Sequence, residues 1–253
     1  MTVAGTVPVA SSWSEPEGIA PRGTLIVVPG RGEHAGVYQR FGTRIAADGY
    51  RVRAVSDPTV DTARALAELR EVLDEEPSGQ AGTAGPAPRV LVGSDTGALF
   101  AAGLVASGEL GDRVDGLVLA GLTLGSGSVP ADWESELTAR TGCPTHQGRL
   151  AADAAVRRGA LADPVDPAWV ARAQGLIPVP VLGLHGDDDE ISPLADVRIW
   201  FGTLPRVELH SIIGGRHDAL NDQTHRTAAA LTVLFLERLR LGVPAIAQLV
   251  ATR

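Results

Sequence analysis

The chain has 253 residues, of which 44% are hydrophobic and 21% charged, so it can bury a core and does not have the composition of a disordered protein. Its formal net charge of −8 at pH 7 disfavours nucleic acid or an anionic membrane as a partner, because both attract concentrated positive charge. We therefore expect one domain, residues 1–253, that acts on a small molecule.

The residue types present exclude several mechanisms. The chain contains no lysine, which excludes Schiff-base chemistry and the lysine of a phosphate-binding loop. Cys143 is its single cysteine, which excludes an internal disulfide and a cysteine-built metal site. The amino-terminal residues lack the basic start and apolar run of a secretory signal, and no apolar run reaches membrane-spanning length. We expect a cytoplasmic protein with no membrane contact, no metal and no cofactor.

Strands and helices are predicted to alternate along the chain. Apolar runs predict strands at residues 24–28, 51–57, 89–93, 115–120, 179–184 and 206–212. Apolar periodicity predicts helices at residues 41–49, 61–75, 96–107 and 222–240. Residues 76–88, rich in Gly, Pro and Ala, predict a surface loop. This order indicates an α/β fold with a mostly parallel sheet covered by helices on both faces.

One interval interrupts the alternation. Between Gly121 and Ile177 the sequence contains no convincing strand but several short helical pieces. One of these begins with Asp166 as N-cap and Pro167 at the first helical position. We interpret residues of about 122–177 as a small helical cap inserted into the domain.

The turn Gly93-Ser94-Asp95-Thr96-Gly97 has the glycine spacing of G-x-S-x-G, in which a nucleophile lies on a strained turn from strand to helix. The nucleophile position falls on Asp95, because Ser94 comes one place too early. An alternative interpretation is an ordinary helix start in which Asp95 is the N-cap.

Two further segments place polar residues after predicted strands. LGLHGDDDEISP contains Asp187, Asp188 and Asp189, and HSIIGGRHDAL contains His217. Each is open to a simpler interpretation, a solvated acidic turn or a surface histidine, and the acidic turn is also a candidate for metal binding. Together with Asp95 they give the chain order nucleophile, acid, histidine that is typical of α/β-hydrolases.

These segments resemble the monoacylglycerol-lipase-like α/β-hydrolases. GRGEHAGVYQRFGTRIAADGYRV resembles their H-G-x-G-E-H-x-x-x-Y segment, HGDDDEISP resembles their H-G-x-x-D-x-x-x-P turn, which selects Asp189, and GGRHD resembles their histidine loop. The resemblance implies an α/β-hydrolase fold, with an oxyanion hole made by the backbone N–H groups of Arg31 and Thr96. The chain departs from these lipases in three ways: Pro29 replaces a histidine, their D-x-R-G-H-G-x-S segment is missing, and Asp95 replaces serine.

An aspartate nucleophile favours a different reaction from ester hydrolysis. A carboxylate attacks saturated carbon that carries a leaving group or a strained ring, and forms an alkyl ester on the enzyme. His217, oriented by Asp189, would then activate water to attack the carbonyl carbon of Asp95. This division of labour resembles epoxide hydrolases and haloalkane dehalogenases, and we predict a hydrolase of this type.

The residues that would bind the substrate are less clearly indicated. The cap contains no tyrosine for opening an epoxide, and Thr96 stands where haloalkane dehalogenases place tryptophan. Trp133 and Trp169 are candidates for substrate-binding N–H donors, or for packing within the cap. Arg31 is a candidate for holding an anionic leaving group or a substrate carboxylate, or it faces solvent.

Two alternatives come from other function classes. Residues 30–35 satisfy the dinucleotide fingerprint G-x-G-x-x-A, with Asp57 ending the next strand as a ribose-binding acid would, which indicates an oxidoreductase. The other is a protein that kept this scaffold without hydrolysis, either as a binding module or as a cyclase or lyase with Asp95 as base.

Overall fold

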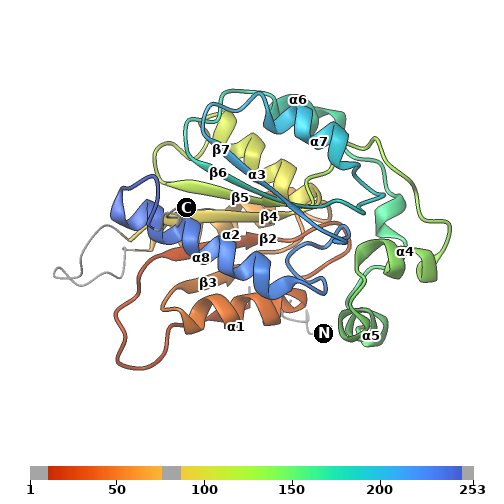
Figure 1. The fold of residues 1–253 in the computed structure, drawn as a ribbon, viewed down its shortest axis with the longest axis horizontal. Coiled ribbons are helices and arrows are strands. Elements are labelled where there is room, and N and C mark those ends of the chain that lie inside the picture. Colours follow the sequence, from red (N-terminus) through yellow and green to blue (C-terminus); the bar gives the residue numbers. More distant parts are fainter. Residues whose placement is uncertain (1–10, 76–86, 247–253) are drawn as a thin grey trace, which may run out of the picture.

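The computed structural model describes residues 11–75 and 87–246, so most of the loop predicted at residues 76–88 lies outside the described residues. A seven-stranded sheet forms the centre of the described part (Figure 1). Its strands are β1 (Ser12–Trp13), β2 (Thr24–Val28), β3 (Arg51–Ala54), β4 (Arg89–Ser94), β5 (Gly116–Ala120), β6 (Val181–Gly186) and β7 (Val207–Ile212). The order is β1-β3-β2-β4-β5-β6-β7, and only the pairing of β1 with β3 is antiparallel. The predicted mostly parallel α/β fold is confirmed.

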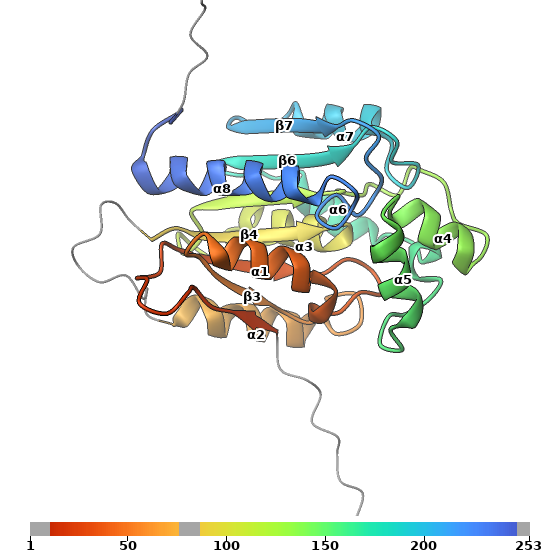
Figure 2. The same ribbon diagram turned by 60° about the horizontal axis from the view of Figure 1, so that its bottom comes forward.

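Helices cover both faces of this sheet (Figure 2). They are η1 (Ala35–Tyr38), α1 (Gln39–Ala47), α2 (Thr62–Asp74), α3 (Thr96–Ala106), α4 (Trp133–Arg140), α5 (Pro144–Ala152), η2 (Ala160–Ala162), α6 (Pro167–Ala173), α7 (Leu194–Phe201) and α8 (His225–Leu241). None of these helices is long and apolar enough to cross a lipid bilayer.

The side chains of β2 show how two cores form on the two faces. Leu25 and Val27 pack with α1 and α8, whereas Ile26 and Val28 pack with α2, α3 and α7. Successive side chains in a strand point to opposite faces, so a strand buried on both faces is continuously apolar. The run TLIVV is buried for this reason.

The chain between β5 and β6 contains α4, α5, η2 and α6, which occupy two different places. Figure 1 shows α4 and α5 together at one end of the sheet, whereas α6 lies with α3 and α7 on a face. The packing agrees, because the ring of Trp169 in α6 lies 5.1 Å from that of Phe100 in α3. We therefore use the word cap for residues 122–166, which precede α6. Three elements, β1, η1 and α7, were not predicted from the sequence.

The turn between β4 and α3 is possible only because of its glycines. A Cβ atom at Gly97 would lie 2.3 Å from the carbonyl oxygens of both Val28 and Pro29, and a Cβ atom at Gly93 would lie 2.3 Å from the Cα atom of Ala98. These neighbours are backbone atoms, which cannot move aside as a flexible side chain does. Helix α3 therefore starts directly against the end of β2.

We predict that Gly97→Ala lowers the free energy of unfolding by about 3 kcal/mol or more, because the added methyl group overlaps two carbonyl oxygens. The matched control is Gly148→Ala in α5, where a Cβ atom would meet nothing within 4 Å. That variant should be neutral or gain up to about 1 kcal/mol from helix propensity. Chemical denaturation of the two variants measures the difference, and equal stabilities would contradict the prediction.

Candidate active site

Asp95 lies on a strained backbone at the turn between β4 and α3. Its φ of +50° and ψ of −123° make it the only residue other than glycine with a positive φ in the described part of the chain. Such a conformation costs about 1–3 kcal/mol and persists only where the surrounding structure imposes it. The side chain of Asp95 makes no capping hydrogen bond to α3, so the interpretation of Asp95 as an ordinary N-cap is wrong.

The structure brings the predicted nucleophile, histidine and acid together. Nε2 of His217 lies 3.1 Å from Oδ1 of Asp95, and its Nδ1 lies 2.9 Å from Oδ2 of Asp189. Asp95 and His217 are each 1% exposed. The other oxygen of Asp189, Oδ1, accepts the backbone N–H groups of Ile191 and Ser192 at 2.9 Å, which fixes the carboxylate toward the imidazole.

Arg31 holds both oxygens of the Asp95 carboxylate. Oδ2 of Asp95 accepts the backbone N–H and the Nε–H of Arg31, both at 2.9 Å, and Oδ1 accepts Nη2–H at 2.9 Å. The third guanidinium nitrogen, Nη1, donates to the carbonyl oxygens of Leu161 at 3.3 Å and Asp163 at 2.6 Å in the cap. Arg31 is 4% exposed, so the suggestion that it faces solvent is wrong.

The charges of this cluster stabilise one another. Burial alone would raise the pKa of Asp95, but the charges of Arg31 and His217, with their hydrogen bonds, hold it well below its usual range. Burial alone would lower the pKa of His217, but Asp189 and Asp95 raise it to about 10. At neutral pH the site therefore contains two carboxylates, an imidazolium and a guanidinium.

The first three backbone N–H groups of the glycine-rich loop after β2 are already engaged within the protein. Gly30 N–H points to the Glu33 carboxylate at 3.3 Å and to the hydroxyl of Tyr38 at 3.2 Å, Arg31 N–H donates to Asp95, and Gly32 N–H donates to Asp57 at 2.9 Å. A pyrophosphate needs these groups free at the start of a helix. The predicted ribose-binding acid instead fixes this loop, and the dinucleotide alternative does not fit the structure.

The other predicted site residues lie farther from the carboxylate or contact it weakly. The hydroxyl of Thr96 lies 3.4 Å from Oδ2 of Asp95. Trp133 lies under the guanidinium of Arg158, 5.3 Å from its carbon, and Trp169 packs against Phe100. Trp169 therefore packs against α3 and not within the cap.

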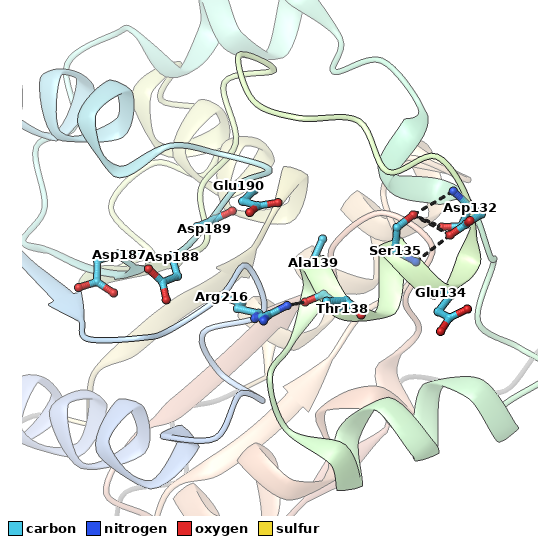
Figure 3. A pocket seen from close by; sticks show the side chains of 10 residues that line it. All are labelled: Asp132, Glu134, Ser135, Thr138, Ala139, Asp187, Asp188, Asp189, Glu190 and Arg216. Carbon is cyan, nitrogen blue, oxygen red and sulfur yellow. Dashed lines mark hydrogen bonds between the residues drawn. The ribbon is translucent and has the colours of Figure 1, made fainter.

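A cavity of about 880 Å³ lies beside the catalytic acid (Figure 3). Acidic side chains approach it from the turn after β6 and from the start of α4, and Arg216 lies between them. Its lining residues are Asp132, Glu134, Ser135, Thr138, Ala139, Asp187, Asp188, Asp189, Glu190 and Arg216. Neither Asp95 nor His217 is among them, and both side chains are buried.

Several polar residues of the site were not predicted from the sequence. Nε2 of His185 lies 3.1 Å from Oδ2 of Asp189 and donates to the carbonyl oxygen of Ser192 at 2.7 Å. It belongs to the same HGDDDEISP segment, which is a signal that could have found it. Arg140, fully buried at the end of α4, donates to the carbonyl oxygen of Arg31 at 2.7 Å. No motif marks Arg140, because its role depends on how the cap folds back onto the sheet.

Comparison with known proteins identifies the fold. No family model matches the chain, and no curated protein sequence matches it. Among solved structures it is similar to a monoacylglycerol lipase from Paleococcus ferrophilus (19% identity, 91% of this chain and 98% of that chain, TM-score 0.72). It is also similar to a soluble variant of monoglyceride lipase from Saccharomyces cerevisiae (15% identity, 91% of this chain and 91% of that chain, TM-score 0.72). A third similar structure is an enol-lactonase from Burkholderia xenovorans (15% identity, 90% of this chain and 95% of that chain, TM-score 0.63). The chain therefore has the α/β-hydrolase fold that its sequence predicts.

We predict that Arg31→Met lowers the free energy of unfolding by about 3 kcal/mol, because it removes the guanidinium that compensates a buried carboxylate. Adding Asp95→Asn to this variant should recover part of the loss, since the carboxylate is then neutral. The control is Arg113→Met, whose exposed ion pair with Asp74 should contribute less than about 1 kcal/mol. Equal effects of the two arginine variants in chemical denaturation would contradict the prediction.

Proposed function

We propose that this protein is a hydrolase that uses Asp95 as a nucleophile on a saturated carbon atom, with His217 and Asp189 activating water. The observation that carries the proposal is the position of Oδ2 of Asp95, which accepts the backbone N–H of Arg31 at 2.9 Å. Oδ2 becomes the carbonyl oxygen of an alkyl ester once Oδ1 has attacked. The donor is then already in place where negative charge develops during hydrolysis of that ester.

The same observation disfavours acyl transfer. A serine hydrolase needs this N–H group free, because the carbonyl oxygen of the substrate has to enter the oxyanion hole. Here the hole is filled by the side chain of the nucleophile itself. An ester substrate would find a carboxylate in place of the attacking hydroxyl, and the N–H of Arg31 already engaged. The proposal therefore departs from the lipases to which the fold is similar.

The proposed reaction has two steps. Oδ1 of Asp95 attacks the carbon atom, the bond to the leaving group breaks, and the leaving group departs with the electron pair. Water then attacks Cγ of Asp95, gives one proton to His217, and the bond between Cγ and Oδ1 breaks to release the alcohol. One oxygen atom of water remains in the regenerated carboxylate, and the net products are an alcohol, a proton and the leaving anion.

The charge on His217 fits this sequence of steps. While both carboxylates are ionised, the pKa of His217 is about 10 and the imidazole is protonated. A serine would need a neutral imidazole at this stage, but an ionised carboxylate needs no activation. Esterification removes the charge of Asp95, so the pKa of His217 falls and the imidazolium releases its proton to solvent. The neutral imidazole can then accept a proton from the attacking water.

Arg31 favours a leaving group that departs as an anion. Its guanidinium, always charged, lies beside Oδ1 of Asp95 at 2.9 Å. An epoxide oxygen instead needs a proton, which tyrosine commonly supplies, and both tyrosines of the chain are engaged elsewhere: Tyr38 donates to Glu33 and Tyr50 to Glu237. The substrate class that fits best is a small alkyl halide, with an epoxide as the second choice.

A non-hydrolytic role is the second candidate, and a specific observation favours it. Arg31 occupies both oxygens of Asp95, and its Nη1 ties the pair to the cap. If these hydrogen bonds of Arg31 never break, Asp95 is only a structural partner of Arg31. The protein would then bind or rearrange a ligand without forming an ester. The experiment below separates the two roles.

We predict that His217→Gln accumulates a covalent ester on Asp95 when it is incubated with a panel of small alkyl halides and epoxides. The first step needs no base, whereas the second does, so the intermediate should persist. Intact-mass spectrometry detects the added alkyl group, and peptide mapping locates it. In the unsubstituted protein, turnover in ¹⁸O-labelled water should place ¹⁸O in the Asp95 carboxylate.

Two variants serve as controls for this experiment. Asp95→Asn should form no adduct, and His210→Gln, which changes a partly exposed histidine paired with Glu208, should turn over without accumulating one. An alkyl group located on another residue, or complete inertness of His217→Gln toward the panel while the protein stays folded, would refute the aspartate nucleophile.

We predict further that Asp95→Ser gains a measurable activity on small aryl esters that the unsubstituted protein lacks. The substitution removes Oδ2 from the N–H of Arg31 and provides a hydroxyl next to His217. Release of the aryl alcohol, followed by absorbance, measures the gain. The double variant Asp95→Ser, His217→Gln is the control and should lose it, and equal rates for the two would show that the triad geometry is not used.

A further inference from the structure

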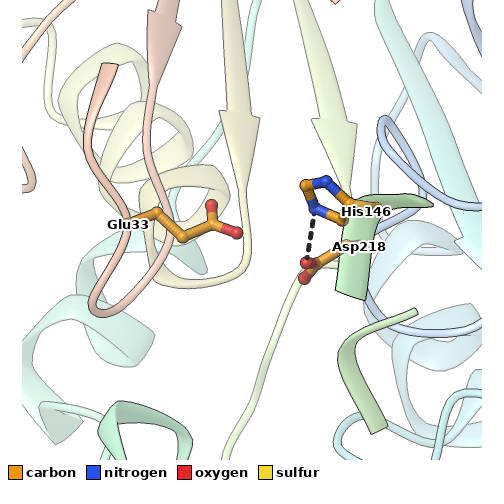
Figure 4. Close-up of side chains that lie close together, drawn as sticks. All are labelled: Glu33, His146 and Asp218. Carbon is orange, nitrogen blue, oxygen red and sulfur yellow. Dashed lines mark ion pairs between the residues drawn. The ribbon is translucent and has the colours of Figure 1, made fainter. Parts of the chain in front are cut away.

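A second buried cluster lies behind the loops that carry Arg31 and His217. Figure 4 shows the carboxylate of Glu33, from the loop after β2, pointing toward His146 of α5 and Asp218 of the loop before α8. All three side chains are less than 5% exposed. One donor atom from each lies within 4.8 Å of the other two.

Two donor atoms of this cluster lack hydrogen-bond partners. Nε2 of His146 and Oδ2 of Asp218 are buried and lie 3.5 Å apart, and neither makes a hydrogen bond among the described residues. Leaving such atoms unsatisfied costs about 1–3 kcal/mol each. In Glu33, Oε2 accepts Tyr38 O–H, whereas Oε1 has only a long contact of 3.4 Å with Arg140. Each residue therefore has one weakly engaged atom available to a ligand.

Buried carboxyl groups outnumber guanidinium groups in this region. Arg140 is bound most closely to Glu136, whose Oε1 accepts its Nε–H at 3.1 Å and its Nη2–H at 2.9 Å. Its remaining nitrogen, Nη1, is farther from the other two carboxylates, 3.4 Å from Glu33 and 3.7 Å from Asp218. Three buried carboxyl groups therefore lie around one guanidinium in a region that excludes water.

We propose that Glu33, His146 and Asp218 bind one divalent transition-metal ion, of which Zn²⁺ is the best match. One imidazole and two carboxylates form a donor set that Zn²⁺ accepts, whereas Ca²⁺ and Mg²⁺ prefer oxygen donors alone. Metal–ligand distances of about 2.0–2.2 Å place the donors of a tetrahedral site about 3.4 Å apart, so atoms that lie within 4.8 Å of one another need to close by up to about 1.5 Å. The ion supplies positive charge and a partner for both unsatisfied atoms.

This ion would connect three segments that are far apart in the sequence. His146 belongs to the cap, whereas Glu33 and Asp218 lie two and one residues from Arg31 and His217. The metal therefore has a structural role, fixing the cap over the loops of the candidate active site.

Metal binding to the full-length protein tests the proposal and needs no substrate. After treatment with a chelator, the protein is titrated with Zn²⁺, Co²⁺, Mn²⁺, Mg²⁺ or Ca²⁺, and bound metal is measured by mass spectrometry of the elements. We expect one equivalent of Zn²⁺ per chain and a rise in the melting temperature of about 5 °C at saturation. Bound Co²⁺ should give the visible absorption bands of a low-symmetry site with few ligands.

Two variants of the cluster are compared with a matched surface variant. His146→Gln and Asp218→Asn should each weaken Zn²⁺ binding by at least about 100-fold. His34→Gln changes another histidine paired with an aspartate, Asp153 at 2.8 Å, in a partly exposed pair, and should leave the affinity unchanged. If a cluster variant does not fold, the Co²⁺ spectrum of the unsubstituted protein decides the question.

Three results would overturn the proposal. The first is the absence of stoichiometric Zn²⁺ or Co²⁺ binding to the folded protein. The second is binding that the His146→Gln and Asp218→Asn variants retain while His34→Gln loses it. The third is a preference for Mg²⁺ or Ca²⁺ over Zn²⁺.

Discussion

The organisation of this molecule depends on one buried carboxylate and the arginine that surrounds it. Asp95 is held at a positive φ where β4 turns into α3, and Arg31 reaches it with a backbone N–H and two guanidinium N–H groups. An ionised carboxylate without such partners would be several kcal/mol less stable in this interior. The pairing therefore fixes the loop after β2, and through Nη1 of Arg31 it also fixes the cap over the end of the sheet.

Arg140 extends this arrangement to the histidine loop. Its Nη2 donates to the carbonyl oxygen of Arg31, and its own carbonyl oxygen accepts the N–H of Asp218 at 2.7 Å, next to His217. Arg140 of α4 thus contacts both the loop that binds Asp95 and the loop that carries His217. The cap is therefore coupled to the triad geometry through buried hydrogen bonds. Opening the cap to admit a substrate would have to loosen the same contacts that align Asp95 and His217.

Local sequence predicted the parts of the fold and site that local physics determines. The apolar run TLIVV and its counterparts predicted the parallel strands, and the glycines at 93 and 97 indicated the strained turn at Asp95. The orientation of Arg31 depends on packing between the loop after β2 and the cap. The sequence alone therefore left open whether its side chain faces solvent. The same reason hides the cluster of Glu33, His146 and Asp218, whose members come from three distant segments. The sequence predicted one cap over residues of about 122–177, which include Trp169. In the structure, α6, which carries Trp169, folds back onto α3.

The identity of the residue at the turn selects the chemistry that the α/β-hydrolase scaffold supports. Serine and aspartate at this turn both depend on a backbone N–H from the loop after β2 that stabilises an oxyanion. The oxygen atom that this N–H binds differs between the two. With serine at the turn, that oxygen belongs to the substrate, so the substrate must contain a carbonyl group. In the proposed reaction that oxygen is Oδ2 of Asp95 and belongs to the protein, so the substrate needs only a carbon atom with a leaving group. The proposal thus moves the carbonyl group of the reaction from the substrate to the protein, and gives Arg31 the role of stabilising the charge of Asp95 until the ester forms.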